Sequence, residues 1–166
     1  LSDKISKHIL KWKVKKFNVY SWLERGSDER QYCAPGVDLP VCSIMRTKHG
    51  FYPEYHTSLD KLGTVVKENG LGGSYELYKS CLEAIEYNCK PKIKVLCEPF
   101  LSKRNLYPNL SIKSANYKKI RLMMHMISFC DGKTSLLQIA EFCKVPIFSL
   151  YDILDQLKKN NLIKIK

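Results

Sequence analysis

The last fifty residues carry the pattern that most restricts the fold, because apolar residues recur there at helical spacing in successive segments. A first helix is predicted over residues 117–130, where the apolar residues recur every three or four positions. Its buried face is predicted to hold Ile120, Met123, Met124 and Ile127. Ser135-Leu-Leu-Gln138 is the sequence of a capping box and predicts the start of a second helix, which runs through Cys143.

A third helix and a strand are predicted next. Pro146 suits the first position of this helix, because proline has no N–H to donate there. The buried stripe is predicted to hold Leu150, Ile153, Leu154 and Leu157, and residues 162–165 then start a strand. Helix, turn, helix, short turn, helix and strand is the order of a winged helix-turn-helix, which we expect over residues 117–166.

The charge pattern leaves two roles open for this C-terminal part. The formal net charge is +12. Residues 91–166 carry 14 Lys/Arg against 5 Asp/Glu, a net +9, whereas residues 1–90 carry 14 against 11, a net +3. Basic charge favours nucleic acid, but Asp152 and Asp155 on the exposed side of the third helix would face phosphates. We therefore expect docking or dimerisation, with DNA binding as the less favoured alternative.

The first half predicts helices and strands in alternation. A helix is predicted from Ser2, as its cap, to about Lys13, with Ile5, Ile9 and Trp12 on one face. Strands are predicted over residues 17–23 and 39–45, each followed by a long loop. A helix over residues 74–88, capped by Ser74, follows with a stripe of Tyr75, Tyr78, Leu82 and Ile85. This order fits the edge of an open α/β sheet, and both loops follow strands, where functional loops gather. We expect an α/β domain over residues 1–96, a connector over 97–116 and the winged helix over 117–166.

The two loops hold the candidate site. His56 stands in Tyr-Pro-Glu-Tyr-His-Thr-Ser-Leu-Asp, ending at Asp60. A neutral imidazole in such a loop is a good zinc ligand, because a carboxylate or a backbone carbonyl can take its second ring proton. The upstream loop holds Gly-Ser-Asp-Glu-Arg-Gln-Tyr, with Asp28 and Glu29 at its centre.

These segments resemble the co-catalytic two-zinc aminopeptidases, in which a Ser-Asp-His segment, a hydrophobic strand and a Tyr-His-Thr-x-x-Asp segment follow one another. More narrowly, they resemble a bacterial aminopeptidase-like group that carries a C-terminal winged helix. The resemblance implies an α/β fold, the C-terminal portion of an open-sheet zinc exopeptidase domain, and a peptide or amino-acyl substrate. It also implies that His56 is a metal ligand, and that the other ligands and the general-base glutamate lie upstream of Leu1. This chain alone is then expected to be inactive.

The neighbours of His56 have more than one interpretation. Asp28, Glu29, Glu54, Tyr55 and Asp60 would line the pocket or orient the metal ligand. Alternatively, Asp28 caps a loop turn beside Arg30, and Glu54 is a solvated loop acid. Glu29 occupies the position at which the resembling family commonly has histidine, so at this position the chain differs from ordinary aminopeptidases. The other three histidines, His8, His49 and His125, show no ligand spacing and are expected to be structural or exposed.

Cysteine usage and hydropathy bear on location. The seven cysteines include no C-x-x-C pair, which is typical of buried thiols in a reducing cytoplasm. No apolar run approaches a membrane span, and the opening residues lack a signal pattern, so we expect a cytoplasmic piece of a longer protein. The favoured function is a zinc aminopeptidase-like hydrolase that assembles through its winged helix. A nucleic-acid-binding module and a non-catalytic interaction domain are the alternatives.

Overall fold

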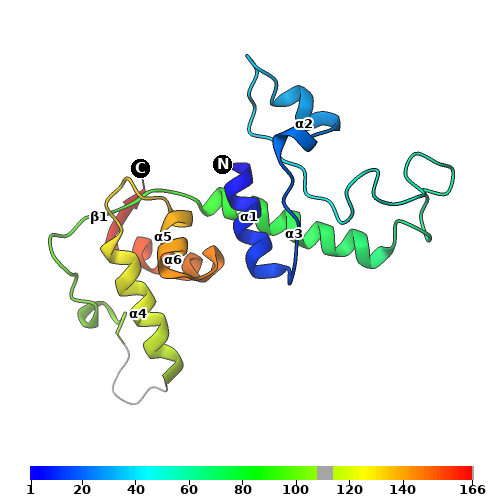
Figure 1. The fold of residues 1–166 in the computed structure, drawn as a ribbon. Coiled ribbons are helices and arrows are strands. Elements are labelled where there is room, and N and C mark those ends of the chain that lie inside the picture. Colours follow the sequence, from blue (N-terminus) through cyan, green and yellow to red (C-terminus); the bar gives the residue numbers. More distant parts are fainter. Residues whose placement is uncertain (108–113, 166) are drawn as a thin grey trace. The chain divides into compact units, whose positions relative to one another are not determined.

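The computed structural model describes residues 1–107 and 114–165, and its contacts divide the chain into two compact units (Figure 1). Unit 1 comprises Leu1–Glu83 and unit 2 comprises Ala84–Lys166. Unit 1 contains α1 (Ser2–Lys13), η1 (Trp22–Glu24), α2 (Ser27–Tyr32) and most of α3 (Glu68–Tyr87). The boundary between the units falls within α3.

Helix α1 covers the predicted range. Ile5 and Ile9 are buried as predicted, whereas Trp12, expected on the same stripe, is 40% exposed. The predicted cap at Ser2 is wrong, since Ser2 is already helical and Leu1 occupies the cap position without a side-chain hydrogen bond. Lys11 and Lys13 lie in the last turn, where cations interact favourably with the helix dipole. Lys13 Nζ donates to Ser80 Oγ over 2.7 Å, which joins α1 to α3.

Helix α3 is longer than predicted and buries a different face. It begins at Glu68 rather than Ser74, so it includes three glycines that the sequence suggested would precede it. Arg46 Nε donates to the carbonyl of Gly70 over 3.0 Å, and the Arg46 side chain occupies the space where a side chain at Gly73 would lie. The predicted stripe is exposed, and the buried positions are Ser80, Cys81 and Ala84.

The two strands predicted in unit 1 are absent. Residues 16–20 have no regular secondary structure and pair with no strand among the described residues, and residues 22–24 form η1 instead. Residues 39–45 likewise pair with no strand among the described residues, although the Leu39 N–H donates a hydrogen bond to the Tyr32 carbonyl. The loop predicted over residues 24–38 contains α2. The loop predicted over residues 46–60 is confirmed, apart from turns and bends.

Unit 2 has the predicted element order. Its helices are α4 (Ser114–Ser128), α5 (Leu136–Cys143) and α6 (Tyr151–Lys159), with η3 (Ile147–Leu150) leading into α6. Strand β2 (Ile163–Ile165) pairs antiparallel with β1 (Pro91–Ile93), and Lys92 lies opposite Lys164. The predicted connector contains η2 (Ser102–Arg104), but residues 108–113 of it lie outside the described residues.

The core of unit 2 is apolar and close to the predicted one. The stripe Leu150, Ile153, Leu154 and Leu157 is buried, each side chain being no more than 1% exposed. On α4, Met126 is fully buried and Met124 is 36% exposed, so the prediction placed the wrong methionine in the core. Burying side chains of this size contributes about 1.5–3 kcal/mol each.

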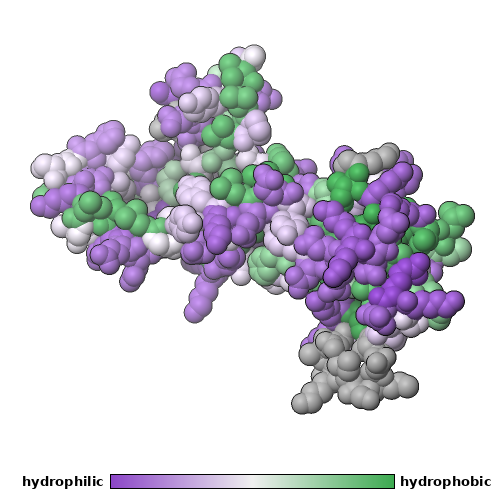
Figure 2. Space-filling model, turned by 180° about the vertical axis from the view of Figure 1, so that it is seen from behind, coloured by the Kyte–Doolittle hydropathy of each residue, from purple (hydrophilic) through white to green (hydrophobic). Residues whose placement is uncertain are grey.

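The surface is not uniformly hydrophilic. Figure 2, which shows one face, has several separate hydrophobic areas among the charged side chains. Two of the seven cysteines, Cys81 and Cys130, are buried; Cys97 is exposed and the others are intermediate, so burial of the thiols is only partly as expected. None of the helices in residues 1–107 and 114–165 combines the length and hydrophobicity needed to cross a membrane.

Candidate functional site

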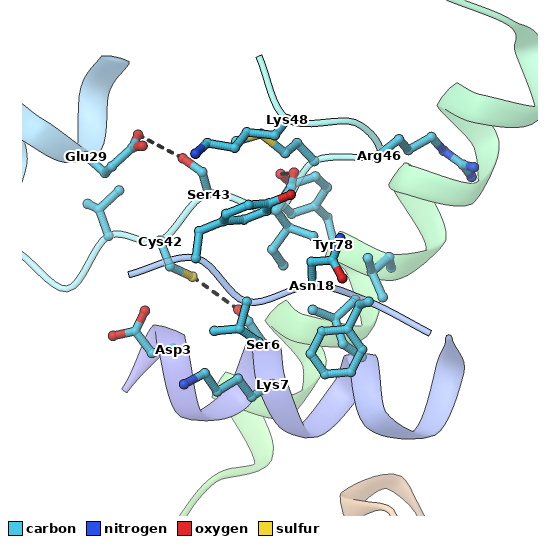
Figure 3. A pocket seen from close by; sticks show the side chains of 18 of the residues that line it. Asp3, Ser6, Lys7, Asn18, Glu29, Cys42, Ser43, Arg46, Lys48 and Tyr78 are labelled. Carbon is cyan, nitrogen blue, oxygen red and sulfur yellow. Dashed lines mark hydrogen bonds between the residues drawn. The ribbon is translucent and has the colours of Figure 1, made fainter. Parts of the chain in front are cut away.

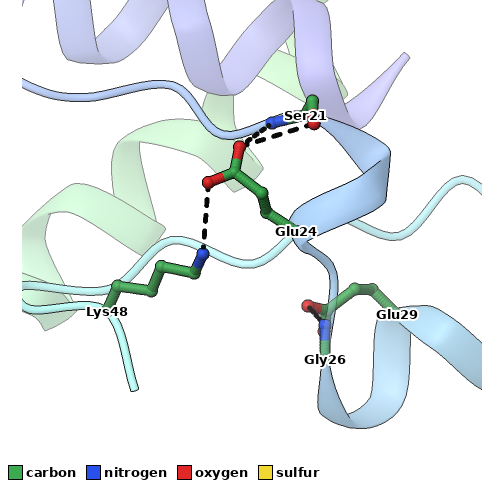
Figure 4. Close-up of polar contacts among 5 residues, drawn as sticks. All are labelled: Ser21, Glu24, Gly26, Glu29 and Lys48. Carbon is green, nitrogen blue, oxygen red and sulfur yellow. Dashed lines mark hydrogen bonds and ion pairs between the residues drawn. The ribbon is translucent and has the colours of Figure 1, made fainter. Parts of the chain in front are cut away.

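Glu29 lies at the centre of the candidate site in unit 1. Its Oε1 accepts a hydrogen bond from the backbone N–H of Gly26 over 2.9 Å, and its Oε2 accepts one from Ser43 Oγ over 2.9 Å (Figures 3 and 4). Burial raises the pKa of Glu29, but these hydrogen bonds and the nearby His49 outweigh it, so the pKa is lowered overall. Glu29 is therefore ionised at neutral pH, and it joins α2 to the extended segment at Ser43.

His49 connects this carboxylate with the second loop. A Cβ atom at Gly26 would lie 2.8 Å from His49 Nε2, so the imidazole occupies the space that any side chain there would need. The ring centroid of His49 lies 6.0 Å from that of Tyr55. Tyr55 in turn stacks on His56, with centroids 4.0 Å apart and planes at 17°. The two predicted loops thus come together through His49, which the sequence had set aside.

Gly26 is the residue whose role explains how His49 joins the site. The backbone at Gly26 is extended, with φ of −148°, so no conformational reason demands glycine. The reason is the close approach of the imidazole, and nothing in the local sequence says which residue approaches.

His56 is exposed and has a left-handed backbone, with φ of 60°. A non-glycine residue in this region stores strain, and such residues concentrate at functional sites. The predicted orienting carboxylate has a different described partner, since Asp60 Oδ2 accepts a hydrogen bond from Tyr52 Oη over 3.1 Å. Burial and then this contact with Asp60 raise the pKa of Tyr52.

The remaining candidates lie around this cluster. Asp28 is exposed in the first turn of α2, and Glu54 is half-buried. The backbone carbonyl of Glu54 accepts a hydrogen bond from Thr57 Oγ1 over 2.7 Å, which holds the turn before His56. Of the other histidines, His8 is 4% exposed on α1 and His125 is exposed on α4.

A second acidic contact supports the same loop. Glu24 accepts hydrogen bonds from the backbone N–H and the hydroxyl of Ser21, and forms an ion pair with Lys48 over 3.5 Å (Figure 4). Lys48 Nζ also lies 4.3 Å from the centre of the Tyr20 ring. These contacts hold the residue before His49 against η1.

The site borders an open groove of about 1570 Å³ in unit 1. Its walls come from α1, the two extended segments, α2 and α3, and both Glu29 and His49 line it (Figure 3). Polar and apolar surface contribute similar shares of these walls. A groove of this size and openness accommodates polypeptide more readily than a single small molecule.

The described residues do not form a zinc site on their own. A catalytic zinc takes three protein ligands and keeps one position for water. Within residues 1–107 and 114–165, no three His, Cys, Asp or Glu side chains group closely enough to hold a metal ion.

In unit 2, the exposed side of α6 carries Asp152 and Asp155 in its first part and Lys158 and Lys159 in its last turn. Asp152 Oδ2 lies 3.4 Å from Lys119 Nζ, and Asp155 Oδ2 accepts a hydrogen bond from Tyr87 Oη over 3.2 Å. The rings of Tyr87 and Tyr151 stack with centroids 4.0 Å apart. The helix that would read DNA bases therefore presents carboxylates, and side chains from α3 and α4 contact it.

Comparison with known proteins agrees with this organisation. Residues 1–88 match the model of a family described as "Domain of unknown function (DUF4910)", and residues 89–165 match one described as "winged helix-turn-helix". The prediction of a winged helix is confirmed.

Two relatives come from Clostridium acetobutylicum. A curated protein named "Putative polysaccharide biosynthesis protein with aminopeptidase-like domain" is 38% identical over 143 residues, which are 83% of this chain and 32% of the relative. A solved structure described as "Crystal structure of putative peptidase" has a TM-score of 0.82 and 32% identity, and the match covers 99% of this chain and 36% of that chain. This chain spans about a third of the length of either relative.

Proposed function

Because this chain belongs to the family described as "Domain of unknown function (DUF4910)", which it matches over residues 1–88, we propose that it forms part of a zinc-dependent aminopeptidase-like hydrolase. The observation that supports this most is the series Glu29, His49, Tyr55 and His56, which joins the two loops that resemble the zinc exopeptidases. The names of both relatives, each with a peptidase term, support the same reaction class. The proposal also includes an open α/β sheet that further polypeptide completes, and a cytoplasmic location.

His56 supplies one imidazole to the metal in this proposal. The exposed ring and the strained backbone suit a residue held at the rim of a site rather than in a core. Glu29, which lines the groove, and Asp28, its neighbour in the first turn of α2, would interact with the amino group of a peptide or amino-acyl substrate. Zinc would supply Lewis acidity there, together with donors and a general base from outside this chain.

The winged-helix unit would serve docking or self-assembly. The ring centroids of Phe129 and Phe142 lie 5.2 Å apart, and the two side chains are 36% and 58% exposed. They form an apolar pair that a partner would cover. Asp152 and Asp155, exposed in the first part of α6, make nucleic acid the less favoured partner, because they would repel phosphates.

The test uses the complete gene product that contains this chain. We expect it to hydrolyse amino-acyl p-nitroanilides, to lose this activity with a chelator and to regain it with zinc. His56→Ala should lower kcat/KM by about 100-fold or more, because it removes a metal ligand. His125→Ala, an exposed histidine on α4, is the matched control and should leave kcat/KM unchanged.

The isolated 166-residue chain should bind no zinc tightly in a calorimetric titration. A stoichiometric high-affinity site in this chain, or full activity of the His56→Ala protein, would overturn the proposed role of His56.

A further inference from the structure

Residues 39–45 have the side-chain pattern of a strand inside an α/β domain. Cys42 and Ile44 are half-buried. Cys42 Sγ lies 3.2 Å from Ser6 Oγ of α1 (Figure 3), and the backbone carbonyl of Ile44 accepts a hydrogen bond from Tyr78 Oη of α3 over 2.7 Å. The alternate side chains of Leu39, Val41 and Met45 are 48%, 36% and 43% exposed. A period of two with one covered face is the pattern of a strand on a helix layer.

The backbone of this segment pairs with no strand among the described residues, although three of its carbonyls accept side-chain hydrogen bonds: those of Leu39 and Val41 from Cys33 Sγ, and that of Ile44 from Tyr78 Oη. Leu39 N–H donates to Tyr32 and Val41 N–H to Leu39, but no backbone hydrogen bond in the described part of the chain is donated by residues 42–45. Residues 16–20 lie extended in the same unit and likewise make no backbone hydrogen bond with a described residue. Unpaired strand edges with apolar side chains readily pair with another strand.

Helix α3 adds an uncovered apolar stripe to the same unit. Leu71, Tyr75, Tyr78 and Leu82 recur at the spacing of one helix face, and they are 54%, 67%, 45% and 63% exposed. An isolated stripe of this length normally packs against a sheet or another helix. The two extended segments and the apolar stripe of α3 together form one side of a layered domain. The described residues supply no further layer to cover that side.

We propose that residues 38–46 pair, as a β-strand, with a strand of the peptidase-like polypeptide that corresponds to the two thirds of the relatives outside the match. This inference rests on the proposed function, because it describes how unit 1 joins the hydrolase. Both relatives are about three times as long as the matched region, so they carry the polypeptide such a layer needs. A second copy of this chain also presents residues 39–45 without a strand partner, and the dependence of the protection on protein concentration distinguishes it from the proposed occupant.

The test measures amide hydrogen exchange in two proteins. The first is this chain alone, and the second is a chimaera in which this chain replaces the matched third of the Clostridium acetobutylicum peptidase relative. In the isolated chain, peptides covering residues 39–46 should exchange as fast as an unstructured segment. In the chimaera, the same amides should exchange about 100-fold more slowly or better, because strand pairing protects them.

Side-chain variants test the outer face of the strand. Val41→Lys and Met45→Lys should remove the added protection in the chimaera, because a charge would be buried against the new layer. Leu96→Lys is the matched control: Leu96 is 95% exposed in unit 2, and its replacement should change nothing at residues 39–46.

Each outcome decides the inference. Unchanged fast exchange of residues 39–46 in a folded chimaera overturns it. If the chimaera does not fold, the full-length relative, which has been crystallised, replaces it, and fast exchange in its equivalent segment overturns the inference equally. Protection that appears in the isolated chain only as its concentration rises would assign the surface to a second copy and overturn the proposed occupant.

Peptidase activity measured on the same preparation separates the two proposals. If residues 39–46 are protected but the protein is inactive, the strand pairing stands and the proposed hydrolase function is overturned. If the protein is active but these residues exchange fast, the hydrolase function stands and the strand pairing is overturned.

Discussion

Gly26 and His49 show how a single close approach connects two loops. The imidazole lies where a side chain at position 26 would be, beside the ionised carboxylate of Glu29. From there the aromatic contacts continue through Tyr55 to His56. The position of the proposed ligand therefore depends on a glycine thirty residues before it.

Replacement of Gly26 by alanine should displace His49. The new Cβ would lie 2.8 Å from Nε2, and relieving such overpacking costs about 1–3 kcal/mol of unfolding free energy. Urea denaturation should show the loss, and the imidazole resonances of His49 in an NMR spectrum should shift. Gly72→Ala is the control, since nothing lies within 4 Å of its Cβ and alanine is the better helix former. If Gly26→Ala behaves like Gly72→Ala, His49 does not depend on this contact.

At the scale of elements, α5 shows how local chemistry places a helix. Ser135 Oγ accepts from the N–H of Gln138, and the Gln138 side chain accepts from the N–H of Ser135. Just before it, the Asp131 carboxylate accepts hydrogen bonds from the N–H groups of Thr134 and Lys133, which lower the pKa of Asp131. Both devices are complete within a few residues, so they form independently of the rest of the chain.

Ser135→Ala should destabilise unit 2 by about 1 kcal/mol, because the N–H of Gln138 loses its acceptor at the helix start. Thermal denaturation followed by circular dichroism measures the change. Ser149→Ala serves as the control, since Ser149 is exposed and its hydroxyl makes no hydrogen bond that the described residues show. Equal melting temperatures for the two variants would mean that the cap contributes nothing to stability.

At the scale of the whole molecule, the net charge of residues 91–166 favours nucleic-acid binding, whereas the two aspartates on α6 oppose it. Residues 91–166 have a net charge of +9, yet the exposed side of α6 carries Asp152 and Asp155. Their contacts with Lys119 and Tyr87 further occupy the surface that would meet a groove of DNA. Aspartate accepts a hydrogen bond from cytosine but repels the phosphates around it, and this is the reason for the expectation that follows.

We expect no sequence-specific DNA binding by this chain. Filter binding at about 50 mM and 200 mM salt should show, at most, weak retention that disappears at the higher salt, as for non-specific phosphate contacts. Asp152→Asn with Asp155→Asn is an informative variant, because it removes repulsion and should strengthen any such contact. Tight binding by the unchanged chain, with a preference among sequences, would restore the nucleic-acid reading of unit 2.

Several features of unit 1 were not predictable from local sequence. Helix α3 begins six residues earlier than Ser74, and Arg46 contacts Gly70 and Gly73 in this additional part of the helix. Residues 17–23 and 39–45 have the composition of strands, but a strand requires a partner, and the described residues supply none. His49 became a site residue only through contacts with Gly26 and Tyr55, which lie 23 and 6 positions away.

The sequence by itself determined the helices of the winged-helix unit, the α5 cap and α1, because periodicity, capping and turn residues act over a few neighbouring positions. It also singled out the two loops around Glu29 and His56. Only the tertiary structure decided that His49 joins these loops, that α3 leaves its apolar stripe uncovered and that residues 39–45 pair with no strand among the described residues. The physical reason is that burial and pairing depend on what packs against a segment, and that information lies far away in the chain or outside it.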